Sequence, residues 1–107
     1  MWTYANTATV GLSISGGTAT CTGAVSPSSN SNNSSVSMTL KRKVGSTWET
    51  YGGAWTASGT GASGCSVKKT KAVVSGYYYK VVVVGKIKNS AGTVLETITV
   101  ESSQKYY

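Results

Sequence analysis

Residues 73–85 have the sequence VVSGYYYKVVVVG, which indicates more about the fold than any other stretch of the chain. Ser75 and Gly76 are turn residues, and the run of aromatic and β-branched side chains after them suits a pleated strand. The run continues to Lys88, where the polar stretch 89–92 predicts a hairpin to a last strand over 93–101. Residues 77–88 are therefore expected to form the clearest strand of the chain.

Similar patterns recur along the rest of the chain. Val10, Leu12 and Ile14 alternate with polar residues and lead into Gly16-Gly17, which predicts a hairpin with a strand over 18–25. Further strands are expected over 36–43, 47–51 and 66–74, a polar loop over 27–35, and a loop or short edge strand over 52–64. No window has helical periodicity, and 17 Ser and 15 Thr favour strands and turns. The sequence predicts one all-β domain over residues 1–107, a two-sheet antiparallel sandwich of about seven strands.

The stretches 73–85 and 89–92 resemble the corner, the following strand and the last hairpin of fibronectin type III and immunoglobulin-like domains. Their Leu-x-Pro-Gly-x-x-Tyr-x-Val-x-Val pattern is matched by Gly76, Tyr79, Val81 and Val83, with Val73 and Ser75 in place of Leu and Pro. The resemblance implies an immunoglobulin-like sandwich with Tyr79 buried and its hydroxyl bonded to the backbone upstream. It also implies that strands 36–43 and 77–88 are neighbours in one sheet.

The chain is also similar to small secreted β-sandwich proteins of Gram-positive bacteria that have no assigned activity. The similarity rests on SISGGTATC at 13–21 and on a Lys-rich strand ending in GSTW at 41–48. It implies an extracellular or cell-surface location. The first residues lack the features of a signal peptide, so we expect that a leader has been removed. No apolar run is long enough to span a membrane.

Acid–base groups are scarce in this chain. Glu49, Glu96 and Glu101 are the only acidic residues, and there is no histidine. General acid–base catalysis and most metal sites need these residue types. We therefore expect no enzyme, no metal site and no cofactor.

The two cysteines, Cys21 and Cys65, are not in a CxxC motif. An even count in a small β domain predicts one structural disulfide and an oxidising compartment, with two unpaired thiols as the alternative. The immunoglobulin-like order implies that this bridge joins neighbouring strands of one sheet.

The formal net charge of +7 favours a polyanionic partner, with solubility as the alternative role. If Tyr79 points inward, the residues alternating with it point outward beside those of strand 36–43. The candidate binding face consists of Lys41, Lys43, Tyr78, Lys80, Val82, Val84, Lys86 and Lys88. Its ammonium groups repel one another, and its two valines are unusual on a solvated surface. Binding, self-association and a plain solvated surface are the three interpretations of this face.

Aromatic residues and loop tips form a second set of candidates. Trp48, Tyr51 and Trp55, together with Trp2, are candidates for stacking on sugar rings, with core packing as the alternative. Loops 26–35, 52–64 and 89–92 have the composition of adaptable binding loops. The final pair, Tyr106-Tyr107, is expected to be frayed.

These observations predict a non-catalytic, secreted or cell-surface binding or adhesion module. The expected partner is an anionic extracellular polymer or a protein. A carbohydrate-binding module and a structural subunit of a surface assembly, which would self-associate, are the alternatives. Nucleic acid is not expected as the physiological partner, because the cysteine pair indicates an extracellular setting.

Overall fold

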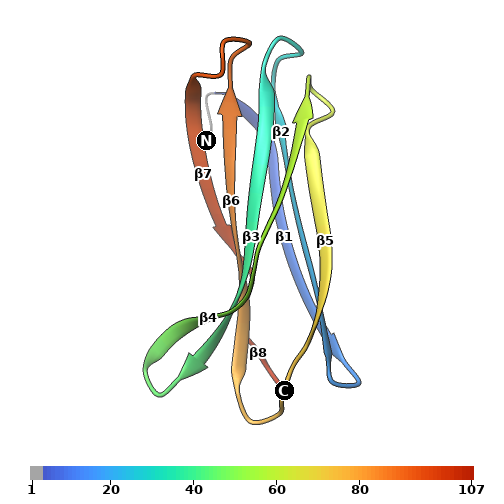
Figure 1. Ribbon diagram of the computed structural model, residues 1–107, viewed down its shortest axis with the longest axis vertical. Coiled ribbons are helices and arrows are strands. Elements are labelled where there is room, and N and C mark those ends of the chain that lie inside the picture. The colour runs from blue at the N-terminus through green and yellow to red at the C-terminus, as the bar shows by residue number, and fades with distance from the viewer. Residues whose placement is uncertain (1–3) are drawn as a thin grey trace.

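The computed structural model describes residues 4–107, apart from the side chains of residues 53 and 54. The described chain is all-β, as predicted, and pairs antiparallel throughout. Its strands are β1 (Ala5–Ser15), β2 (Thr18–Pro27), β3 (Asn33–Val44), β4 (Thr47–Thr60), β5 (Cys65–Ala72), β6 (Tyr78–Lys88), β7 (Val94–Glu101) and β8 (Lys105–Tyr106). Figure 1 shows their arrangement.

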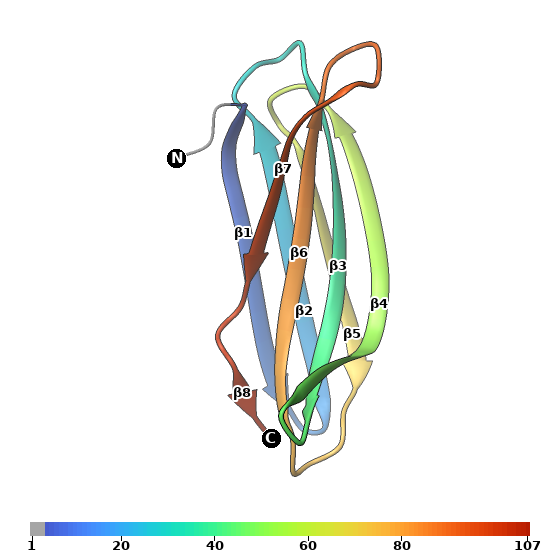
Figure 2. The ribbon, with the colours of Figure 1, turned by 90° about the vertical axis from the view of Figure 1, so that its left-hand side faces the viewer.

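Two sheets pack face to face as an elongated sandwich of 45 × 25 × 20 Å. One sheet has the order β1-β2-β5, and the other has the order β4-β3-β6-β7 with β8 paired to the lower end of β6. Figure 2 shows the two layers from the side, with β1 in one and β6 in the other. This order is compatible with an immunoglobulin-like arrangement and confirms the predicted two-sheet sandwich.

The core lies between the sheets and follows the predicted alternation. On β6 the inward residues Tyr79, Val81, Val83 and Ile87 are at most 1% exposed. β2 faces them with small side chains, and a Cβ atom on Gly23 would lie only 2.7 Å from a methyl group of Val83. The sheets therefore approach closely where β2 crosses β6, and a larger residue there would overpack the core.

The predicted tyrosine corner is present. The hydroxyl of Tyr79 donates to the carbonyl oxygen of Val74 at 2.8 Å and accepts from the Val74 N–H at 3.2 Å. The bonds satisfy two backbone groups in the connection from β5 to β6 and hold that crossing between the sheets. The predicted hairpin at Gly16-Gly17 is also confirmed: both glycines have positive φ, 58° and 79°, and Ser15 pairs with Thr18 across the turn.

Three predictions of where the chain forms strands were wrong. The stretch 52–64 is neither a loop nor a short strand for most of its length, because β4 continues to Thr60 by pairing with β3. The loop 27–35 is shorter than predicted, since β3 already begins at Asn33. The end of the chain is not frayed, because β8 pairs with Tyr78 and Tyr79 of β6.

The predicted disulfide is absent, and both cysteines are free. They lie on neighbouring strands, as the immunoglobulin-like order implied, but Cys21 is opposite Lys69 whereas Cys65 is opposite Val25. This offset of four positions (21 to 25) separates them by roughly 13 Å along the strands, at about 3.3 Å per residue. A disulfide needs Cα atoms within about 7 Å, so this register forbids the bridge. The inference of an oxidising compartment from the cysteines loses its support.

Candidate functional site

The candidate binding face is the outer surface of the five-stranded sheet. Lys41 lies directly opposite Lys80, Thr39 opposite Val82, Ser37 opposite Val84, Ser35 opposite Lys86, and Asn33 opposite Lys88. β4 and β7 extend the same surface on either side with hydroxyl residues, namely Thr50, Thr56, Ser58, Thr97 and Thr99. The structure thus brings the predicted lysines and valines together, and adds rows of Ser and Thr that the prediction did not include.

The basic residues of this face form two groups. Lys41, Lys43 and Lys80 lie towards the end that holds the β3–β4 turn, which is the lower end in Figure 1. Lys86 and Lys88 lie towards the opposite, upper end. Lys86 lies six positions along β6 from Lys80, which corresponds to roughly 20 Å. Glu101, opposite Val82, is the acidic residue of the face, so five lysines and one glutamate leave a formal charge of +4.

Each group has a different environment. Lys80 is held in place: its Nζ lies 2.9 Å from Glu101 Oε1 and 4.6 Å from the centre of the Trp48 ring. Lys41 donates to the hydroxyl of Thr50 at 3.2 Å. Neither Lys86 nor Lys88 has a hydrogen bond or ion pair with a side chain among the described residues. The upper group is therefore the more available for an external anion.

A shallow depression lies between the two groups. Its volume is about 590 Å³, and it is lined by residues of β3, β4 and β6: Ser35, Val36, Ser37, Thr56, Ala57, Ser58, Val84 and Lys86. Small residues on β3 and β4 form its floor beside the larger side chains of β6. It offers the hydroxyl groups of Ser and Thr, the methyl groups of Val84 and the ammonium group of Lys86. Such a mixture of groups can recognise a polar polymer that also has some apolar surface.

The three aromatic residues predicted to stack on sugars do not form a common platform. Tyr51 lies edge-on to Tyr79 at 5.6 Å, with Arg42 and Lys71 against its ring. Trp55 is half-buried and packs against the core. Trp48 carries Lys80 over its ring. Trp2 lies outside the described residues.

An exposed aromatic pair lies at the lower end of the face, formed by Tyr78, which the sequence analysis placed on this face, and Tyr106, which it did not. Tyr78 and Tyr106 are 44% and 64% exposed, and their ring centres are 4.9 Å apart. They line a cavity of about 300 Å³ with Lys43, Gly45, Gly76 and Tyr77. The tyrosine pair at the chain terminus was the available signal, but its pairing with β6 depends on the whole fold.

The loop tips are held by their own hydrogen bonds. Asn30 Oδ1 accepts from the N–H of Ala62 at 2.9 Å, which ties two loops at the upper end together. Asn89 Oδ1 accepts from the N–H groups of Ala91 and Thr93, both at 3.0 Å, and closes the last hairpin. The asparagine side chains that would make these loops adaptable are used to fix them.

The described part of the chain holds no group of side chains that could bind a metal ion. No cluster of three or more Cys, Asp or Glu side chains occurs among those residues. Burial raises the pKa of the Cys21 thiol to about 11, which keeps it protonated and unreactive at neutral pH. Within the described chain no helix is long and apolar enough to cross a membrane.

No protein family, curated protein or solved structure was found to match this chain.

Proposed function

We propose that this protein is a non-catalytic binding module that recognises an anionic extracellular polysaccharide along the outer face of the β4-β3-β6-β7 sheet. The observation that carries the proposal is a face of formal charge +4 on which the ammonium groups of Lys86 and Lys88 have no side-chain partner among the described residues. A bound polyanion can pair with these groups and relieve the repulsion between the lysines of the face.

The arrangement of the face supports a chain-like ligand. The two groups of lysines lie roughly 20 Å apart, with the hydroxyl-lined depression between them. An extended polymer can pair its anionic groups with lysines at both ends and its hydroxyl groups with Ser and Thr in the middle. Val82 and Val84 offer apolar surface to the C–H groups of sugar rings.

The proposal also includes an immunoglobulin-like family and a location outside the cell. The strand order and the Tyr79 corner support an immunoglobulin-like domain of the fibronectin type III kind. An anionic wall or matrix polymer is found outside the cell, so the proposed ligand agrees with a secreted or cell-surface module.

Binding of polygalacturonate, with neutral dextran as the comparison, tests the proposal. We expect polygalacturonate to bind and dextran not to bind. The affinity should fall steeply as salt is raised from 20 to 300 mM, since the screening length is about 8 Å at physiological ionic strength. The double substitution Lys86→Glu and Lys88→Glu should weaken binding at least about tenfold and leave the melting temperature nearly unchanged, because exposed charges contribute little to stability.

The matched control is Lys68→Glu with Lys69→Glu on β5, which changes net charge by the same amount on the other sheet. Both residues are exposed. This variant should bind nearly as well as the wild type. Equal loss in both double variants would mean that net charge alone attracts the polymer, and the proposed site would be wrong.

A structural role in a surface assembly is the second candidate function, and the edge strand β1 favours it. β5, at the opposite edge of the same sheet, carries Lys68, Lys69 and Lys71, and charge of this kind hinders edge-to-edge pairing. β1 has eleven residues and no charged side chain. Dimers or larger species without any polymer, seen by analytical ultracentrifugation, would favour this second candidate.

A further inference from the structure

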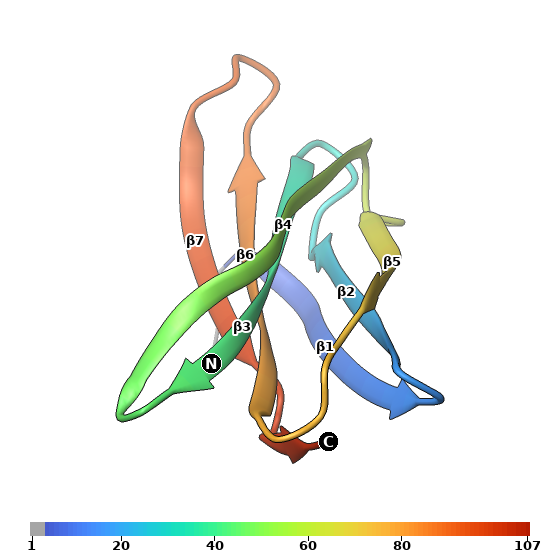
Figure 3. The same cartoon turned by 60° about the horizontal axis from the view of Figure 1, so that its bottom comes forward.

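The cavity at the lower end of the outer face combines aromatic surface with positive charge. Three segments that are distant in the sequence build it: the β3–β4 turn, the connection into β6, and β8. Figure 3 shows these segments at the end of the sandwich that comes forward in that view. Tyr78 and Tyr106 supply exposed rings, and Lys43 supplies the ammonium group.

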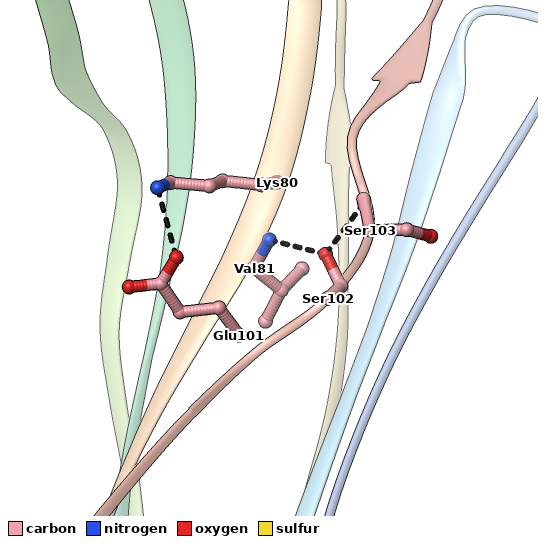
Figure 4. A network of polar contacts seen from close by, with 5 residues as sticks. All are labelled: Lys80, Val81, Glu101, Ser102 and Ser103. Atoms are coloured by element: carbon pink, nitrogen blue, oxygen red, sulfur yellow. Dashed lines mark hydrogen bonds and ion pairs between the residues drawn. The ribbon is translucent and has the colours of Figure 1, made fainter.

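The cavity rests on a backbone that is firmly tied. The Ser102 hydroxyl oxygen accepts from the Val81 N–H at 2.8 Å (Figure 4). The Ser102 N–H donates to the Val81 carbonyl at 2.9 Å. Beyond it, the Tyr107 N–H donates to the Tyr77 carbonyl at 3.1 Å, and the Gly76 N–H donates to the Tyr107 carbonyl at 2.6 Å. β8 is thereby fixed beside β6, so the Tyr106 ring is presented in a defined position.

The ammonium group of Lys43 lacks an acidic partner. In contrast to Lys80, which is paired with Glu101, it makes no hydrogen bond or ion pair with any described residue. Behind it, the Arg42 guanidinium lies between the rings of Tyr77 and Tyr51, at 4.5 and 4.7 Å from their centres. Arg42 Nε is buried without a hydrogen-bond partner among the described residues. The Lys43 ammonium group in an open aromatic cavity, with the Arg42 charge behind it, favours an anionic ligand.

We infer that this cavity is a binding subsite for one sugar ring that carries a carboxylate. In this arrangement the ring stacks on Tyr78 and Tyr106, and its carboxylate pairs with Lys43. The inference rests on the proposed function and specifies it: the cavity receives one uronate unit at the lower end of the face, while the lysines of the upper end hold the rest of the chain.

A sugar fits the surroundings better than a nucleotide does. Proteins that bind single-stranded nucleic acid repeat aromatic platforms along a groove, so that successive bases can stack. Above the tyrosine pair, the outward residues of β6 are Lys80, Val82, Val84, Lys86 and Lys88, and those of β3 are mainly Ser and Thr. A sugar polymer can use these hydroxyl groups, whereas successive bases would find only the Trp48 ring, over which Lys80 already lies.

Titration with trigalacturonate, followed by NMR of the tyrosine rings, tests the inference. The ring signals of Tyr78 and Tyr106 should shift, and Tyr106→Ala should weaken trigalacturonate binding about tenfold. Tyr106→Phe should bind within about twofold of the wild type, because the ring is retained. Lys43→Gln should remove the preference for trigalacturonate over neutral maltotriose.

Two controls separate this inference from the proposed function. Tyr4→Ala removes an exposed tyrosine that lies beyond the other end of the face, beside the start of β1, and should not affect binding. The Lys86→Glu, Lys88→Glu variant should still bind trigalacturonate while its binding of polygalacturonate is weakened.

The remaining outcomes decide between the uronate subsite and the proposed function. If polygalacturonate binds but Tyr106→Ala behaves as the wild type, the subsite is wrong and the proposed function stands. If neither the polymer nor the trisaccharide binds, both are wrong. Tighter binding of an oligothymidylate at the same tyrosines would overturn the assignment to a sugar.

Discussion

Tyr78 and Tyr79 are neighbours in the sequence, yet they lie on opposite sides of the five-stranded sheet. Tyr79 is fully buried and holds the corner before β6 through its hydroxyl, whereas Tyr78 is 44% exposed beside Tyr106. The same contrast runs along the whole strand. The inner side of β6 is apolar core, and its outer side carries Lys80, Lys86 and Lys88 next to two valines.

Under the proposed function, stability and binding are supplied by opposite sides of one strand. Substitutions on the inner side should change the free energy of unfolding and affect the ligand only through unfolding. Substitutions on the outer side should change affinity with little effect on stability.

The larger stability effect is expected at the tyrosine pair. Tyr79→Phe should lower the free energy of unfolding by about 1 to 3 kcal/mol, because it removes the buried hydroxyl and leaves the partly buried backbone groups of Val74 without that partner. Tyr78→Phe should have almost no effect, since that hydroxyl makes no hydrogen bond with a described residue. Urea denaturation of both variants measures the difference. Equal losses would mean that the two sides of β6 are not distinct.

A smaller effect is expected from Cys21 on the inner side of β2. Burial raises its pKa from 9.0 to about 11, so the folded state retains a proton that the unfolded state releases above pH 9. The stability that this provides is present below pH 9 and is lost as pH rises towards 11. At pH 10 the loss should be about 1 kcal/mol relative to pH 8, as one pKa unit corresponds to about 1.4 kcal/mol.

Cys21→Ala isolates this contribution from the titration of lysines and tyrosines. The difference in unfolding free energy between wild type and variant should narrow between pH 8 and pH 10. A difference that stays constant over this range would show that the thiol titrates normally and is not desolvated.

Alternation of side chains allowed much of the fold to be predicted from the sequence. Strand β6 has Tyr79, Val81 and Val83 at every second position, which fixes both its structure and its inward side. The outer lysines follow from the same alternation, and the neighbouring position of β3 follows from the resemblance. The orientation of these residues could be predicted from the sequence of one or two strands alone.

Strand register and long-range pairing were not predictable in this way. Cys21 and Cys65 were placed on the correct neighbouring strands, but composition says nothing of an offset of four positions between them. The upper half of β4 has few apolar residues, and its strand structure comes from pairing with β3. The cavity beside Tyr106 joins three distant segments, so no local pattern announces it.

The most direct test of the account is a map of the bound polymer on the protein by ¹⁵N NMR. Titration with a galacturonate oligomer long enough to span the lysines should shift amide signals along β3 and β6, including Ser37, Val84 and Lys86. Signals of Thr20 and Thr22, which lie on the outer side of the other sheet, should not change. Shifts of equal size on both outer surfaces, or shifts confined to β1, β2 and β5, would contradict the account.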